Sequence, residues 1–234
     1  MGGWYSDVPE ELLLKEPLPI KRLSETEVEK FMRETLSLNM DVLNNPCFLG
    51  GGFWIHYVPP LVDEIASSPE LLTSYTPYQP EISQGLLQIL FEYQSMIADL
   101  YGMDVANASM YDWATAIAEA MLMSIRVTKR RKIVMPKYMP PWRKRVVETY
   151  LKPHDIEIVY YNYDTETGRA NLNSLAELLD DVAAVYIENP NFFGVIEEEA
   201  EEIGKLTHDK GGLFVVGADP LSLGVYEAPG NYGA

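Results

Sequence analysis

Residues 184–190 read Ala-Val-Tyr-Ile-Glu-Asn-Pro, an apolar run that ends in two polar residues and a proline. Similar apolar runs predict three further short strands, at 133–136, 156–161 and 213–219. Segments with helical character separate them, near 140–151, 171–180 and 197–209. Strands that alternate with helices indicate right-handed crossovers, and therefore a mostly parallel sheet with helices on both faces. The predicted fold class is α/β.

Two polar residues fall where predicted strands end, Asn189 and Asp219. Sites in parallel sheets lie at the carboxyl ends of the strands, so both residues are candidates for a ligand site. Each also has a purely structural explanation, because Asn or Asp directly before a proline commonly starts a turn. The sequence leaves both interpretations open for each residue.

The N-terminal part of the chain differs from the rest. Residues 1–23 are rich in proline and predict an extended arm, lying over a partner or over the body of the fold. Ser24 and Glu27 form a capping-box pattern that starts a helix, which we expect to end near Leu38. We predict an arm and helix at 1–58, followed by one large domain at 59–234.

The segment Tyr-Thr-Pro-Tyr-Gln-Pro-Glu-Ile-Ser-Gln-Gly at 75–85 combines rigidity with polar groups. Pro77 and Pro80 fix their own φ and push the preceding residues toward extended conformations. The segment leads into a predicted helix over 82–101, whose first turn offers free N–H groups. A rigid polar loop suits a small-molecule site. The residues give equal weight to a second interpretation, in which the loop only leads into the helix and its tyrosines pack against the protein. The candidate residues are Tyr75, Thr76, Tyr78, Gln79 and Glu81.

Composition excludes several classes of function. A net charge of −17 over 234 residues argues against nucleic acid or an anionic membrane surface as a partner. Cys47 is the single cysteine, so neither an internal disulfide nor a cysteine-based metal site is expected, and a cytoplasmic location fits. The three histidines lack metal-ligand spacing with carboxylates, so we predict no metal. No apolar run approaches the length of a membrane span.

Six runs of sequence together resemble one known family. They lie, in order, at 48–52 (Phe-Leu-Gly-Gly-Gly), 56–59 (His-Tyr-Val-Pro), 75–85, 102–112 (Gly-Met-Asp-Val-Ala-Asn-Ala-Ser-Met-Tyr-Asp), 189–197 (Asn-Pro-Asn-Phe-Phe-Gly-Val-Ile-Glu) and 218–224 (Ala-Asp-Pro-Leu-Ser-Leu-Gly). On these runs the chain resembles subunit 1, the α or N-terminal-half subunit, of the glycine cleavage system P-protein family (decarboxylating glycine dehydrogenase). The resemblance extends from about Tyr5 to the last residue.

The resemblance implies the large domain of the aspartate-aminotransferase-like, fold-type-I pyridoxal-phosphate (PLP) enzymes. It implies that a partner, P-protein subunit 2 (β), holds PLP on its own lysine and decarboxylates glycine. The aminomethyl group would then pass to the lipoyl arm of H-protein. In this picture the α chain completes the pocket across the interface. The 75–85 candidates and His56 would line that entrance, with Asn189 and Asp219 near the cofactor by fold position.

The chain departs from a PLP enzyme in two places. None of its lysines is placed to form the internal aldimine. In the fold that the resemblance implies, the lysine that does so follows the position of Asp219 by a few tens of residues. The phosphate turn reads Ser109-Met110-Tyr111-Asp112-Trp113, where Asp112 would repel phosphate and Trp113 would fill its space. We therefore expect no catalytic residue and no covalently bound PLP on this chain.

Three interpretations remain open at this point. The first is a fragment of an α subunit, incomplete at its C-terminus, that supports a PLP-bearing partner. The second is a stand-alone PLP enzyme, against which the missing lysine counts. The third is a structural or regulatory relic of the fold, which Trp113 favours.

Overall fold

The computed structural model describes residue 3 and residues 6–48 and 54–234. Contacts divide the chain into two units, residues 1–49 and 50–234. The first unit contains η1 (Glu10–Leu12) and α1 (Glu25–Leu36), and none of its described residues is buried. The predicted capping box is confirmed, because the Ser24 hydroxyl accepts from the Glu27 amide and the Glu27 carboxylate accepts from the Ser24 amide. Of the run at 48–52, residues 49–52 lie outside the described part of the chain.

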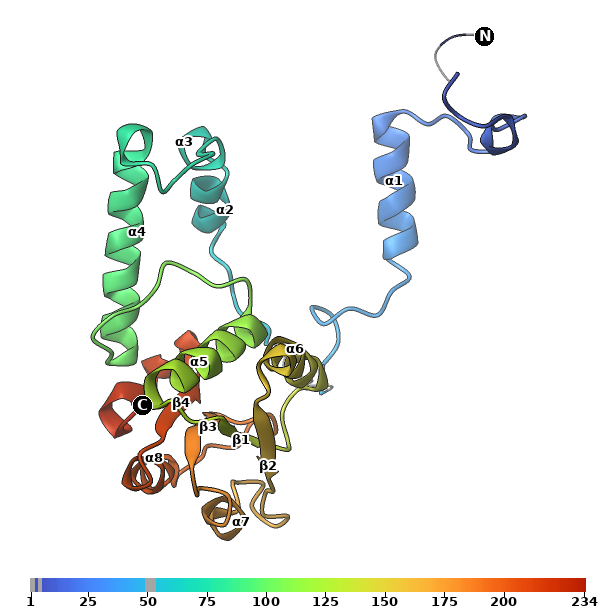
Figure 1. Ribbon diagram of the computed structural model, residues 1–234. Coiled ribbons are helices and arrows are strands. Elements are labelled where there is room, and N and C mark those ends of the chain that lie inside the picture. Colours follow the sequence, from blue (N-terminus) through green and yellow to red (C-terminus); the bar gives the residue numbers. More distant parts are fainter. Residues whose placement is uncertain (1–2, 4–5, 49–53) are drawn as a thin grey trace. The chain divides into compact units, whose positions relative to one another are not determined.

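Within residues 54–234, four parallel strands form one sheet in the order β2-β1-β3-β4 (Figure 1). The strands are β1 (Lys132–Pro136), β2 (Glu157–Tyr161), β3 (Val182–Glu188) and β4 (Leu213–Gly217). The predicted parallel α/β fold is thus confirmed, with strand ends within two residues of expectation. β4 ends two residues before the predicted position, because Asp219 instead caps the short helix η3 (Pro220–Gly224).

Helices cover both faces of the sheet (Figure 1). α5 and α6 lie on one face, and α7 and α8 lie on the other. The strand order reverses direction at β1, so the crossover through α6 passes over one face and the two later crossovers, through α7 and α8, pass over the other. The helices and short turns of this part are α5 (Trp113–Thr128), α6 (Pro141–Leu151), η2 (Lys152–His154), α7 (Leu172–Ala176), α8 (Ala200–Asp209) and η4 (Pro229–Tyr232).

The sheet separates two hydrophobic clusters. Alternate residues of the strands point to opposite sides, so Ile133 packs toward α5 and α6 while Val134 packs toward α7 and α8. All seven residues of β3 are buried, as expected for a central strand covered on both faces. The arrangement fixes the carboxyl ends of β1 and β3 side by side, which is where ligand crevices open in such sheets.

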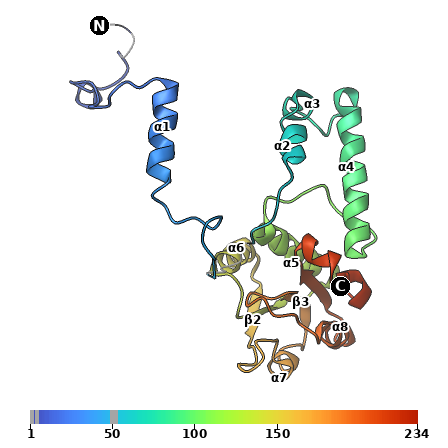
Figure 2. The ribbon, with the colours of Figure 1, turned by 180° about the vertical axis from the view of Figure 1, so that it is seen from behind.

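A second group of helices precedes α5. It consists of α2 (Pro60–Ala66), α3 (Pro69–Leu72) and α4 (Pro80–Tyr101). α4 begins two residues before the predicted start, with Pro80 in its first turn, and ends at Gly102 in a left-handed conformation with φ of 67°. Its C-terminal end is joined to the sheet by a hydrogen bond from the Tyr101 hydroxyl to the Ala218 carbonyl (2.8 Å). Both views of the ribbon show α4 extending away from the sheet (Figures 1 and 2). No described helix is both long and apolar enough to cross a membrane.

Candidate functional site

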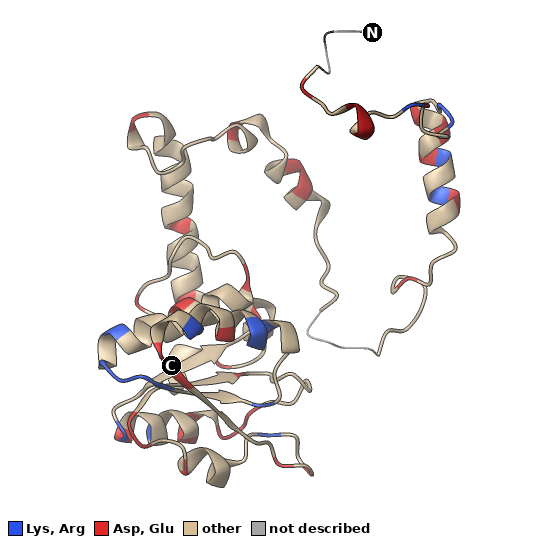
Figure 3. Ribbon diagram, turned by 45° about the vertical axis from the view of Figure 1, so that its right-hand side comes forward, with Lys and Arg blue, Asp and Glu red and all other residues tan. Residues whose placement is uncertain are grey.

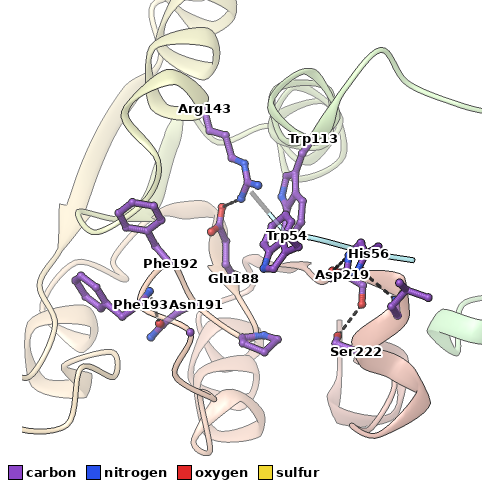
Figure 4. Close-up of a pocket in the computed structure, with 13 residues that line it drawn as sticks. Trp54, His56, Trp113, Arg143, Glu188, Asn191, Phe192, Phe193, Asp219 and Ser222 are labelled. Carbon is purple, nitrogen blue, oxygen red and sulfur yellow. Dashed lines mark hydrogen bonds and ion pairs between the residues drawn. The ribbon is translucent and has the colours of Figure 1, made fainter. Parts of the chain in front are cut away.

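A cavity of about 470 Å³ opens at the carboxyl ends of β3 and β4 (Figure 4). Its position agrees with the rule for parallel sheets, since the turns after both strands contribute to its wall. The N-terminal turns of α5 and α6 and the segment before α2 complete it. The lining residues are Trp54, His56, Trp113, Arg143, Glu188, Pro190, Asn191, Phe192, Phe193, Gly194, Asp219, Leu221 and Ser222.

Asp219 is held from two sides. Its Oδ2 atom lies 2.7 Å from Nε2 of His56, and its Oδ1 atom accepts a hydrogen bond from the Leu221 amide (3.0 Å). The second contact makes Asp219 the cap of η3, which is the structural role that the sequence left open. The first contact joins two residues that the sequence placed in separate candidate groups. Both oxygens of the carboxylate therefore have partners within the chain.

A buried ion pair forms the floor of the cavity. Nη1 of Arg143 lies 2.8 Å from Oε1 of Glu188, and each side chain is 5% exposed. The Tyr186 hydroxyl donates to the same oxygen (3.1 Å). Burial raises the pKa of Glu188, and the Arg143 guanidinium acts in the opposite direction. Removing either charge would leave the other one buried without compensation.

The sequence analysis did not single out Arg143 or Glu188. The sequence could have identified Glu188 as a site residue. It follows the apolar residues of a predicted buried strand, and a buried carboxylate needs a cationic partner. Its partner lies on α6, 45 residues earlier in the chain. No local pattern specifies that pairing.

Two indole rings fill the space beside this pair. The rings of Trp54 and Trp113 stack with centroids 5.4 Å apart, and the guanidinium carbon of Arg143 lies 3.9 Å from the centroid of the Trp113 ring. Trp113 Nε1 donates to the Tyr186 hydroxyl (2.8 Å). The indole of Trp113 is therefore held by stacking, a cation–π contact and a hydrogen bond. It lies against the ends of β3 and β4, beside Tyr186 and Gly217.

The first turn of α5 already holds an anion of its own. The Asp112 carboxylate accepts from the Thr115 amide (2.7 Å), and the Thr115 hydroxyl accepts from the Asp112 amide (3.1 Å). The Thr115 amide and hydroxyl both donate to the carboxylate, and these bonds lower the pKa of Asp112. A carboxylate that caps the helix takes up an N–H group that a phosphate would need, and its charge would repel the phosphate.

These residues do not fit PLP. Among the described residues that line the cavity there is no lysine to form an aldimine. The helix terminus expected to hold phosphate is capped by the Asp112 carboxylate, which would repel a phosphate dianion. The lining therefore offers neither an amine for the aldimine nor an uncapped helix terminus for the phosphate.

Asn189 lies at the end of β3 as predicted, but it does not line the cavity. Its Oδ1 atom accepts from the Glu197 amide (3.1 Å), and its own amide donates to the Gly217 carbonyl (2.9 Å). The first contact closes the turn after β3, and the second continues the pairing of β3 with β4. Asn189 thus makes the turn-forming contacts that the sequence allowed as its alternative.

The loop candidates lie apart from this cavity, because none of the residues Tyr75, Thr76, Tyr78, Gln79 and Glu81 lines it. The side chains of Tyr75 and Tyr78 are 94% and 73% exposed. Within the loop, the Thr76 hydroxyl donates to the Gln79 side chain (3.2 Å), and the Thr76 carbonyl accepts from the Ser83 hydroxyl (3.2 Å). The loop is therefore attached to α4 and presents its phenols outward. Of the predicted entrance residues, His56 alone belongs to the cavity.

Within the described part of the chain, no group of three or more His, Cys, Asp or Glu side chains is arranged to hold a metal ion. Cys47 is exposed and unpaired as a thiol.

Comparison with known proteins gives a consistent result. The family model described as glycine cleavage system P-protein matches residues 4–234. "Probable glycine dehydrogenase (decarboxylating) subunit 1" of Thermococcus onnurineus is 52% identical over 230 residues, which are 98% of this chain and 51% of that relative. The protein of the same description from Staphylothermus marinus is 54% identical over 216 residues, 92% of this chain and 46% of the relative. The chain spans about half the length of the curated relatives it matches.

Solved structures agree with the sequence relatives. The crystal structure of an inhibitor-bound glycine decarboxylase (P-protein) of the glycine cleavage system superposes with a TM-score of 0.81 at 41% identity. The match covers 98% of this chain and 51% of that chain. A sphingosine-1-phosphate lyase of Burkholderia pseudomallei has the same fold at 11% identity, with a TM-score of 0.53 over 91% of this chain.

Proposed function

The chain belongs to the glycine cleavage system P-protein family, and from that premise we propose that it is a non-catalytic part of a decarboxylating glycine dehydrogenase. Its task is to support a partner chain, subunit 2, which holds PLP on a lysine of its own and decarboxylates glycine. The aminomethyl group then passes to the lipoyl arm of H-protein. The assembly works in the cytoplasm.

The carrying observation is the lining of the cavity around Asp219. No lysine is among its described residues, and the first turn of α5 beside it is capped by the Asp112 carboxylate. A subunit that performed the chemistry would need a lysine for the aldimine and a helix terminus open to the phosphate. The contacts therefore favour a supporting role over the stand-alone PLP enzyme.

The segment at 75–81 has the properties that such a supporting subunit would contribute. Two prolines limit its conformational freedom, so little entropy is lost when its side chains make directed contacts. Its phenols point outward and are not used by the chain itself. We assign Tyr75, Thr76, Tyr78, Gln79 and Glu81 to the entrance of the site on the partner.

Reconstitution tests the proposal. The chain and the cognate subunit 2 are purified separately, and each is assayed alone and together for exchange of the glycine carboxyl group with labelled bicarbonate. Activity is expected from the mixture and not from this chain alone. Exchange by this chain alone with added PLP would reject the supporting role. Failure of the chain to associate with subunit 2 would favour the third interpretation, a structural or regulatory relic of the fold.

A further inference from the structure

The cavity at the carboxyl ends of β3 and β4 contains a carboxylate oxygen to which no described residue donates. Oε1 of Glu188 accepts the hydrogen bonds from Arg143 and Tyr186, and Oε2 accepts none from the described part of the chain. The Glu188 side chain is 5% exposed and lines the cavity, as Figure 4 shows. A buried carboxylate oxygen without a donor is costly, so a ligand that donates to it supplies a contact that the chain itself does not make.

The charges that line the cavity favour a cation. Arg143 and Glu188 compensate each other as an ion pair, which leaves the Asp219 carboxylate as the remaining acidic charge. Both carboxylates lie at the same edge of the sheet, because Glu188 pairs with Gly217 in the register of β3 and β4. The chain as a whole has the same sign: its net charge is −17, and acidic residues, red in Figure 3, outnumber basic ones. A cation is therefore attracted to this edge, whereas an anion meets, among the described lining residues, only a guanidinium that is already paired.

Aromatic rings form much of the wall of the cavity. Trp54, Trp113, Phe192 and Phe193 all line it. The guanidinium carbon of Arg143 lies 3.9 Å from the centroid of the Trp113 ring and 5.5 Å from that of Trp54, so these rings already hold one cation against their faces. Trp54 is 49% exposed and Phe193 is 48% exposed, so part of each ring is open to a ligand. The wall therefore suits a ligand with an apolar or aromatic body behind its charge.

The phenylalanine side of this wall is fixed by Asn191, which is buried. Its Oδ1 atom accepts from the amides of Phe193 (3.0 Å) and Val195 (3.2 Å), and its Nδ2 atom donates to Oε1 of Glu197 (2.7 Å). These contacts hold the turn that carries Phe192 and Phe193. A wall that is fixed before binding loses little entropy when a ligand enters.

We propose that the cavity binds a primary amine with an apolar or aromatic body. The ammonium group donates to Oε2 of Glu188, Asp219 supplies the net negative charge, and the body of the ligand packs against Trp54 and Phe192. A quaternary ammonium lacks the N–H donor that Oε2 needs, and an amino acid brings a second carboxylate, which Asp219 repels. The volume of about 470 Å³ is within the range of small-molecule sites. The inference goes beyond the proposed function, because it concerns this chain alone and involves no partner subunit.

Three matched probes test the chemistry of the ligand. Benzylamine carries an amine on a benzyl group, benzyl alcohol carries a neutral hydroxyl in its place, and phenylglycine adds a carboxylate beside the amine. Each is titrated into the full chain at pH 8, the upper end of the range in which imidazoles change charge, because His56 contacts Asp219 and is charged only when protonated. Tryptophan fluorescence reports binding, since Trp54 and Trp113 line the cavity. Benzylamine is expected to bind about 10-fold more tightly than benzyl alcohol, and phenylglycine no more tightly than the alcohol.

Substitutions of single carboxylates test the location of the site. Glu188→Gln and Asp219→Asn each remove one negative charge from the cavity, and Asp180→Asn removes one from an exposed side chain outside it. Each cavity variant is expected to weaken the binding of benzylamine about 10-fold and to leave that of benzyl alcohol unchanged, whereas the control changes neither. Asp219→Asn leaves the pair of Arg143 and Glu188 in place, so it decides the question if Glu188→Gln does not fold.

The amine site is supported if benzylamine binds more tightly than benzyl alcohol and loses this preference in the cavity variants alone. Equal affinities for the amine and the alcohol would reduce the cavity to an apolar pocket and overturn the proposal. Absence of benzylamine binding at millimolar concentrations would overturn it as well, as would unchanged amine binding in Asp219→Asn. None of these outcomes depends on subunit 2, so the proposed function is tested separately.

Discussion

Nε2 of His56 and Oδ2 of Asp219 lie 2.7 Å apart although the two residues are 163 positions apart in the sequence. The contact attaches the extended segment before α2 to the end of β4. The side chain of His56 is 39% exposed and that of Asp219 is 13% exposed, so the pair is only partly shielded from water. Its contribution to stability is accordingly modest.

A double-mutant cycle on this pair is expected to give a coupling free energy of about 0.5–1 kcal/mol. Asp219→Ala should cost about 1 kcal/mol more than His56→Ala, because it also removes the acceptor for the Leu221 amide. Urea unfolding followed by tryptophan fluorescence measures both values. His154→Ala, an exposed histidine of η2, is the control. A coupling free energy indistinguishable from zero would show that the contact does not fasten the segment.

Removing one member of the buried pair should be far more costly. Arg143→Met is expected to lower the free energy of unfolding at pH 7 by about 3–5 kcal/mol, because it leaves the Glu188 carboxylate buried without a counter-charge. Arg143→Met/Glu188→Gln should recover part of this loss. If the single variant loses no more unfolding free energy than the double variant, Arg143 and Glu188 do not act as a buried ion pair in which each charge compensates the other.

The same pair predicts a pH dependence. Burial raises the pKa of Glu188 above its usual value of 4.5, so its contribution to stability is present below pH 4.5 and is lost as the pH rises through the raised pKa. In Arg143→Met the opposing effect of the guanidinium is gone, and the pKa rises further. The stability gap to wild type should therefore narrow as pH falls from 8 toward 5. The gap between Arg143→Met and the double variant, which lacks the carboxyl group, should narrow over the same range, because only the single variant keeps the titrating group. A gap between wild type and Arg143→Met that stays constant with pH would refute the prediction.

Cofactor binding is a direct test of this account of the cavity. Incubation of the chain with PLP followed by borohydride reduction is expected to leave no lysine modified stoichiometrically, because no lysine is among the described residues that line the cavity. Peptide mass spectrometry locates any adduct. The denatured chain, treated in the same way, gives the background of nonspecific lysine modification. One adduct per chain at a single lysine would contradict the account of the cavity.

The elements of the sheet were predictable because their signals are local. Apolar runs four to seven residues long identify β1 to β4, and Gly102 marks the end of α4 by its backbone preference, whereas α4 starts at Pro80, two residues before the predicted position. The position of Asp219 followed from the rule for parallel sheets. Its neighbours did not, because the partners of Asp219 and Glu188 are set by the packing of segments far apart in the chain.

The loop candidates show a second kind of relationship that the sequence could not predict, the distance between residues in the fold. The sequence grouped His56 with the 75–81 residues because all fall in runs that resemble one family, and shared resemblance says nothing about distance within the fold. The structure assigns His56 to the cavity at the sheet and leaves Tyr75 and Tyr78 on the outside of the loop. The roles of the loop residues stay a prediction.

Tyr78→Phe tests that prediction, since it removes one hydroxyl while keeping the ring. In the complex with subunit 2, loss of a hydroxyl that contacts substrate, cofactor or lipoyl arm should cost about 1–3 kcal/mol, or about a 5- to 150-fold fall in kcat/KM for glycine decarboxylation. The melting temperature should not change, because the Tyr78 side chain is 73% exposed and makes no contact that a hydroxyl deletion would break within its own chain. Tyr150→Phe on α6, 38% exposed and outside the loop, is the matched control and should leave the rate intact. Because the two substitutions delete the same atom, a rate loss confined to Tyr78→Phe can only come from the position of that hydroxyl. Equal rates in both variants would make the loop a purely structural entry to α4.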